Sequence, residues 1–200
     1  MTQAKQRFLS FDDYLTYDDG TDALYELFNG ELIEVPPESG QNTEIAVFLL
    51  LQFAAIVGHI RVRPHGLELE VRGEPRNRYP DLTILREEHV PQLQRRNTIR
   101  LSMAPPILVV EVVSPGELVV EVVSPGELQR DRDYVAKRSQ YAAIAVPEYW
   151  IVDPEIEVIS VCELDNSEYQ VTQFRGNDRI VSPNFDDLHL TAEQVLKAGE

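Results

Sequence analysis

A ten-residue segment, Leu-Val-Val-Glu-Val-Val-Ser-Pro-Gly-Glu, occurs twice in succession, at 108–117 and again at 118–127. Five of its first six residues are aliphatic, which is typical of a strand buried on both faces, and Ser-Pro-Gly predicts a turn. Because the repeat length is even, Glu111 and Glu121 would point to the same side of a strand. Two such short copies do not make a solenoid. Only one copy can therefore occupy a central strand, while the other forms a hairpin or extends a loop.

The remaining patterns predict an α/β protein with a mixed central sheet, flanking helices and a β-hairpin near each end. The residues 1–200 are expected to form a single domain. We expect strands at 68–72, 81–85, one copy of the repeat and 149–153 to share the central sheet. The other predicted elements are a short helix capped by Ser10, a hairpin around Asn29-Gly30, a helix over 43–56, a strand at 60–63, a helix over 131–143 packed on the sheet, a hairpin at 158–174 and a helix capped by Thr191.

The acidic and basic residues are distributed unevenly along the chain. A net charge of −16 argues against polyanionic partners, but residues 61–138 hold 13 of the 18 bases and only 12 of the 34 acids. This middle region is either a set of solvated loop charges or a locally basic surface beside an acidic site.

Several features favour a cytoplasmic protein without a membrane partner. The longest apolar run, at 45–57, is shorter than the roughly 20 residues of a membrane span. Met1–Ser10 lacks the apolar core of a signal peptide. Cys162 is the single cysteine, which excludes an intramolecular disulfide.

Carboxylates within apolar strands are the candidate ligands, because a buried charge without a partner is costly. Asp81 follows Pro80 at the start of one strand, and Glu111 or Glu121 interrupts another. Two carboxylates on adjacent strands suit a hard cation such as Mg²⁺, although each alone could cap a strand or pair with a core arginine. Glu44 could add a carboxylate, or serve only as a favourable acid near a helix N-terminus. His65, in a turn with no neighbouring histidine, is interpreted as structural.

The predicted helix 131–143 places Asp133, Lys137 and Tyr141 on one face, four residues apart. One interpretation is a local Asp–Lys pair beside a tyrosine that packs on the sheet. The other places the Lys137 ammonium near a metal, where it orients water or stabilises charge at phosphorus. The sequence has no serine in a nucleophile elbow and no glycine-rich phosphate loop, which disfavours hydrolase triads and nucleotide kinases.

Five motifs follow one another along nearly the whole chain: Tyr25-Glu26-Leu27 with Asn29-Gly30, Tyr79-Pro80-Asp81-Leu82, the repeated Leu-Val-Val-Glu-Val-Val-Ser-Pro, Arg130-Asp131 with Lys137 and Tyr141, and Pro147-Glu148-Tyr149-Trp150. In this order they resemble the Uma2 family, which is abundant in cyanobacteria. The resemblance implies the restriction-endonuclease-like fold of the PD-(D/E)xK superfamily, with Asp81 as the first acid and the Glu of Glu-Val-Val as the second. It also implies a Mg²⁺- or Mn²⁺-dependent endonuclease that hydrolyses DNA phosphodiester bonds.

One departure from the family pattern concerns the lysine. The third position of E-x-K is Val113 or Val123, so Lys137 on the following helix is the candidate replacement. The missing strand lysine, the duplicated strand and the acidity favour an alternative, a catalytically inactive nuclease-fold module for binding or regulation. The sequence leaves a homodimer open.

The duplication is the second departure, because the extra ten residues must be absorbed on one side of the strand. The spacing from Asp81 to Glu111 fits the family, and so does the spacing from Glu121 to Lys137. The strand-to-helix connection behind the site is expected to be tighter than the loop before it. We therefore favour Glu121 as the strand glutamate, with Glu111 as the alternative.

Overall fold

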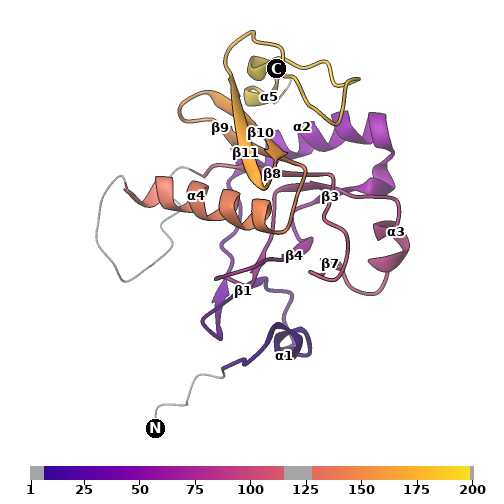
Figure 1. The fold of residues 1–200 in the computed structure, drawn as a ribbon, viewed down its shortest axis with the longest axis vertical. Helices are drawn as coiled ribbons and strands as arrows, with labels where there is room; N and C mark the ends of the chain where they lie inside the picture. The colour runs from indigo at the N-terminus through magenta and orange to yellow at the C-terminus, as the bar shows by residue number, and fades with distance from the viewer. Residues whose placement is uncertain (1–6, 115–127, 199–200) are drawn as a thin grey trace.

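The computed structural model describes residues 7–114 and 128–198, apart from the side chains of residues 128–134. In Figure 1, α1 and β1 lie at one end of the molecule and α5 lies at the other. The helices are α1 (Phe11–Leu15), α2 (Gly40–Val57), the 3-10 helix η1 (His59–Arg61), α3 (His89–Gln92), α4 (Leu128–Ala143) and α5 (Ala192–Leu196). The strands are β1 (Tyr25–Phe28), β2 (Glu31–Glu34), β3 (Val62–Pro64), β4 (Glu68–Glu70), β5 (Asn77–Arg78), β6 (Leu82–Ile84), β7 (Thr98–Ile99), β8 (Leu108–Val112), β9 (Glu148–Asp153), β10 (Val158–Asp165) and β11 (Glu168–Phe174).

A six-stranded mixed sheet in the order β11-β10-β9-β8-β6-β3 forms the centre of the fold. β8 and β9 are parallel, and the other neighbours are antiparallel. This confirms the predicted α/β architecture with a mixed sheet. The C-terminal hairpin β10–β11 extends the central sheet, whereas the N-terminal hairpin β1–β2 is separate. Asn29 and Gly30 have φ of 49° and 79°, the left-handed conformations that a two-residue hairpin turn requires.

The prediction that residues 68–72 join the central sheet is wrong. β4 belongs instead to a three-stranded sheet in the order β5-β4-β7. The alternation of Leu67, Leu69 and Val71 correctly indicated a strand with one buried face, since all three side chains are buried. An alternating pattern identifies a strand and its buried face, but it does not specify the partner strands.

The first copy of the repeat forms β8, which corrects the preference for the second copy. Ile107 N donates a hydrogen bond to Ile84 O, and Val113 N donates to Val152 O. The whole segment 107–113 is thus fixed between its two neighbouring strands, and the extra residues fall between β8 and α4. Glu111 therefore occupies the strand position. Glu121 lies outside the described residues.

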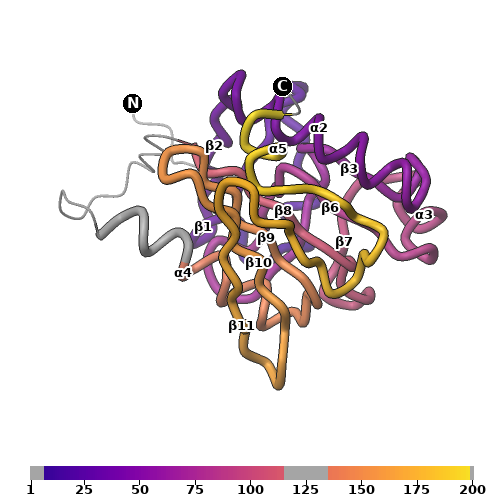
Figure 2. The backbone as a smooth tube through the Cα atoms, turned by 90° about the horizontal axis from the view of Figure 1, so that it is seen from above, coloured from indigo at the N-terminus to yellow at the C-terminus, as the bar shows by residue number. Residues whose placement is uncertain are grey.

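Helices cover both faces of the central sheet. Figure 2 shows α2 and α5 on one side of the central strands and α4 on the other. Along β9, Trp150 packs on the α2 side with Phe53, and Tyr149 packs on the α4 side with Tyr141. By length and composition α2 could also span a membrane, which by itself is weak evidence for a span. Four of its residues are buried in this structure: Asn42, Ile45, Leu49 and Phe53.

Candidate active site

Three neighbouring strands bring one polar residue each into a row. Leu82 of β6 lies opposite the last residue of β3 on one side and opposite Val110 of β8 on the other. Extending both registers by one residue, just beyond the ends of β3 and β6, sets His65 opposite Asp81 and Asp81 opposite Glu111. Directly opposed residues of antiparallel strands point to the same face, with Cβ atoms about 5 Å apart. The pairing of β3, β6 and β8 therefore places His65, Asp81 and Glu111 side by side.

Asp81 is a buried acid in an electrostatically unfavourable position. Only 4% of the residue is exposed, and its Oδ2 accepts a 2.6 Å hydrogen bond from Val112 N. Burial, together with the negative charges of Glu111 and Glu38, raises the pKa of Asp81 to about 8. The hydrogen bond from Val112 offsets only part of this effect. A cation beside Asp81 would relieve both the desolvation and the repulsion.

Glu111 is buried and receives hydrogen bonds from two side chains of α4. Lys137 Nζ donates to Oε2 at 2.9 Å, and Tyr141 Oη donates to Oε1 at 2.5 Å. Burial and the charge of Glu111 raise the pKa of Tyr141 well above its usual value, so the phenol stays protonated as a donor. Lys137 therefore contacts Glu111 of β8. This contact is required by the interpretation that places the Lys137 ammonium near a metal. The Asp133 side chain lies outside the described part of the chain.

The position of α4 is fixed by Gln140, one helical turn from Lys137. Gln140 Nε2 donates to two backbone carbonyls of the 72–75 loop, at 3.2 and 3.0 Å. Its Oε1 accepts from Arg78 Nε at 2.9 Å, and Arg78 pairs with Glu26 at 3.1 Å. Burial raises the pKa of Glu26, while the charges of Arg78 and Lys137 lower it. These contacts tie the helix that carries Lys137 to β1 and β5.

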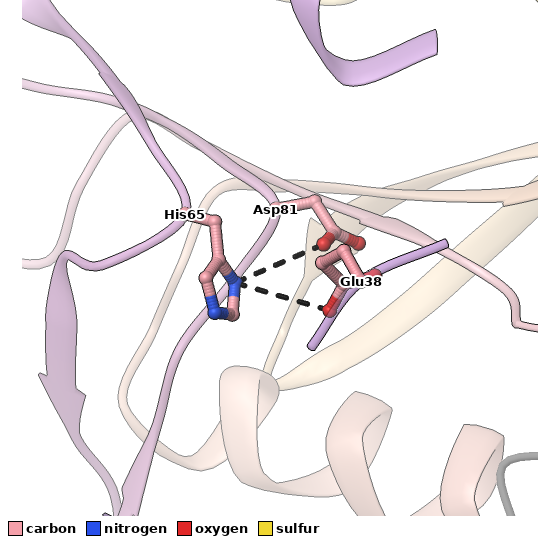
Figure 3. Close-up of side chains that lie close together, drawn as sticks. All are labelled: Glu38, His65 and Asp81. Atoms are coloured by element: carbon pink, nitrogen blue, oxygen red, sulfur yellow. Dashed lines mark ion pairs between the residues drawn. The ribbon is translucent and has the colours of Figure 1, made fainter. Parts of the chain in front are cut away.

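A second group of ligand atoms adjoins Asp81. The Nδ1 atom of His65 lies 4.0 Å from Asp81 Oδ1 and 4.0 Å from Glu38 Oε1. Figure 3 shows the three side chains pointing toward one another, and one ligand atom from each lies within 4.8 Å of the others. His65 Nδ1 is buried, and no hydrogen-bond partner for it is found within the described chain. The interpretation of His65 as structural missed this arrangement, which could hold a divalent cation.

The carboxylate next to His65 and Asp81 does not come from the acid of α2 that the sequence analysis proposed. Glu44 is exposed on α2 and is not among the three grouped ligands. Glu38 comes instead from the segment just before the Ser39 N-cap of this helix. Asn42 fixes the start of α2 to the end of β8, because its Nδ2 donates to Val112 O at 3.1 Å and to Ser114 Oγ at 2.7 Å. The Ser39 cap was a signal in the sequence that places Glu38 at the start of α2, whereas the position of His65 depends on the pairing of β3 with β6.

The hydrogen bond from Tyr141 to Glu111 is expected to contribute measurably to stability. Tyr141→Phe should lower the free energy of unfolding by about 1.5–3 kcal/mol, because the phenol donates to a buried charged acceptor. Tyr169→Phe is the matched control, since Tyr169 Oη donates to the neutral carbonyl of Val146 at 2.8 Å. Its expected cost is about 0.5–1.5 kcal/mol. Urea unfolding measures both, and an equal or smaller loss for Tyr141→Phe would contradict the prediction.

Comparisons with known proteins identify the family and the fold. The model of the Uma2 family, described as "Putative restriction endonuclease", matches residues 11–117 and 115–193. Each matched range contains one copy of the repeat. No curated protein matches the sequence.

A crystal structure from Anabaena variabilis, described as "a putative nuclease belonging to DUF820", is similar to this fold with a TM-score of 0.67. The two sequences are 15% identical, and the alignment covers 96% of this chain and 99% of that one. At this identity the likeness shows a shared fold. Because the family model matches most of its length, the chain belongs to the Uma2 family.

Proposed function

We propose that this protein is a metal-dependent endonuclease that hydrolyses phosphodiester bonds in DNA. The observation that carries the proposal is the 2.9 Å contact between Lys137 Nζ and Glu111 Oε2, in the same row as Asp81. A helix thus supplies the lysine that the strand lacks at Val113. The electrostatic effects of Glu111 and Lys137 on Asp81, just before β6, support placing the three residues in one site.

The donor atoms present fit a divalent cation. Asp81 and Glu111 offer carboxylate oxygens, the ligands that Mg²⁺ and Mn²⁺ favour, and the unsatisfied Nδ1 of His65 adjoins Asp81. Held by these residues, a divalent cation would supply Lewis-acid chemistry, polarising a phosphoryl oxygen and lowering the pKa of a coordinated water. Lys137 holds a positive charge against Glu111, where it can orient the attacking water and stabilise the charge that develops at phosphorus. Tyr141 keeps Glu111 oriented by donating to its second oxygen.

The net charge of −16 opposes general binding to DNA, so contact with the phosphates must be local. Arginines of the 61–138 region would supply that contact. DNA as the substrate, a cytoplasmic location and a homodimer stay predictions.

The direct test is cleavage of supercoiled plasmid and of single-stranded DNA by the full chain, with Mg²⁺, with Mn²⁺ and with EDTA. We expect nicked or linear products with an added ion and none with EDTA. An Asp81→Asn variant purified in parallel excludes a contaminating nuclease. If neither ion supports cleavage of either substrate, the proposal is wrong and the inactive binding or regulatory module is favoured.

A further inference from the structure

We propose that His65 and Glu38 complete the metal site next to Asp81, and that this mixed nitrogen and oxygen site prefers Mn²⁺ to Mg²⁺. The inference rests on the proposed function only in placing the ion at Asp81. It assigns two ligands that neither the PD nor the E-x-K motif contains, and it predicts the class of ion that the protein takes up.

The distances favour a shared ion over a hydrogen-bonded histidine. At 4.0 Å, Nδ1 of His65 is too far from Asp81 Oδ1 and from Glu38 Oε1 for a hydrogen bond to either. An imidazolium paired with a carboxylate would approach to about 2.8 Å. Ligands that bind one ion at about 2.1 Å stand about 3 to 4 Å apart. The observed separations are close to this range, so a small inward shift of the side chains would complete the site.

The three side chains are held toward this point by independent contacts. Asp81 is fixed through Oδ2 by Val112 N, which leaves Oδ1 facing His65. Glu38 Oε2 lies 3.5 Å from Asn42 Nδ2, which leaves Oε1 facing the histidine. His65 follows β3, whose pairing with β6 sets it opposite Asp81. The buried Nδ1 of His65 has no hydrogen-bond partner among the described residues, so a bound cation would supply one.

The nitrogen ligand determines the preference among ions. Mg²⁺ favours oxygen ligands and retains several waters, whereas imidazole is a good ligand for first-row transition metals. Replacing one oxygen or water ligand by His65 Nδ1 therefore strengthens Mn²⁺ binding more than Mg²⁺ binding.

The test is calorimetric titration of the full chain, without DNA, with Mn²⁺ and with Mg²⁺. His65→Asn puts an amide group near the position of Nδ1 and removes the imidazole. The matched control is His59→Asn, because His59 is exposed on η1 and is not part of the ligand group found among the described residues. We expect the parent to bind Mn²⁺ about tenfold or more tightly than Mg²⁺, and His65→Asn to remove most of that difference. The His59→Asn variant should bind both ions as the parent does.

Pulsed EPR of the Mn²⁺ complex gives a readout that does not depend on activity. We expect coupling of ¹⁴N to Mn²⁺ in the parent and in His59→Asn, and its loss in His65→Asn. Mn²⁺ that binds without ¹⁴N coupling, an unchanged Mn²⁺/Mg²⁺ ratio in His65→Asn, or no binding of either ion would overturn the inference. The cleavage assay decides the proposed function separately. Cleavage with an ion bound by oxygen alone overturns only this inference, whereas a nitrogen-ligated Mn²⁺ without cleavage overturns only the proposed function.

Discussion

Replacing Asp81 with asparagine is expected to abolish metal binding and DNA cleavage while making the metal-free protein more stable at pH 8. The amide oxygen of asparagine can still accept the hydrogen bond from Val112 N. The substitution removes the buried negative charge that faces Glu111 and Glu38. Cleavage should fall by about 1000-fold or more, because a principal ligand of the ion is lost.

The direction of the stability change follows from the raised pKa of Asp81. A folded-state pKa of about 8 lies above the value of about 3.9 in an unfolded chain, so the folded protein binds this proton more tightly. The stability contributed by Asp81 is therefore complete below about pH 4 and is lost as the pH rises through about 8. Asp81→Asn lacks this dependence, and its advantage over the parent should grow to a few kcal/mol at pH 8.

Urea unfolding in EDTA at pH 5 and pH 8 measures this effect. The matched control is Asp153→Asn, because Asp153 is also buried and its Oδ1 accepts from Glu155 N and Ile156 N. No stabilisation is expected there, because two backbone N–H groups already donate to its carboxylate in a turn. Saturating Mn²⁺ should then stabilise the parent but not Asp81→Asn, because only a protein that binds the ion gains from it. A parent as stable as Asp81→Asn at pH 8 in EDTA would contradict the electrostatic account of this site.

Local patterns in the sequence were sufficient for much of the fold and for part of the candidate site. Asn29-Gly30 formed the expected hairpin turn, and both Ser10 and Thr191 formed the expected capping boxes. Asp81 and Glu111 stood out because an acid within an apolar strand needs a partner. Such signals depend on residues that are near one another in the chain.

The parts that local patterns did not predict depend on pairing between distant segments. The sheet to which β4 belongs is decided by its contacts with β5 and β7. His65 becomes a candidate ligand only because β3 pairs with β6, across the intervening strands β4 and β5. No single residue in the turn around Gly66 reveals that pairing.

The choice between the two copies of the repeat has a similar basis. Both copies have the same propensity to form a β-strand. Which copy enters the sheet therefore depends on where an insertion of ten residues costs the least free energy of folding. An insertion between β8 and α4 leaves the register of Leu82 with Val110 unchanged, and Lys137 still reaches Glu111. Because the entropy of closing a connection rises slowly with its length, a longer link at this place adds little cost.

Replacing Lys137 with methionine is expected to reduce cleavage by about 100-fold or more while metal binding survives. Methionine keeps the aliphatic part of the side chain and removes the ammonium, which is not a metal ligand. Glu111 then retains only the hydrogen bond from Tyr141 among its two described donors, so the metal-free protein should lose about 1–3 kcal/mol of stability. Lys197→Met is the control, because Lys197 forms an exposed pair with Glu193 on α5, and it should leave cleavage unchanged.

Calorimetry with Mn²⁺ separates the loss of catalysis from a loss of the ion. A Lys137→Met protein that binds Mn²⁺ as the parent does, but cleaves plasmid slowly, shows that the lysine acts on the reaction. A Lys137→Met protein that cleaves at the parental rate would make Lys137 structural and require another general base. Lys137→Arg then distinguishes two roles, because a guanidinium keeps the positive charge but does not give up its proton near neutral pH. Substantial cleavage by Lys137→Arg would identify the lysine as a source of positive charge. If Lys137→Arg instead loses as much cleavage as Lys137→Met, the role of Lys137 is proton transfer or a specific placement of its ammonium.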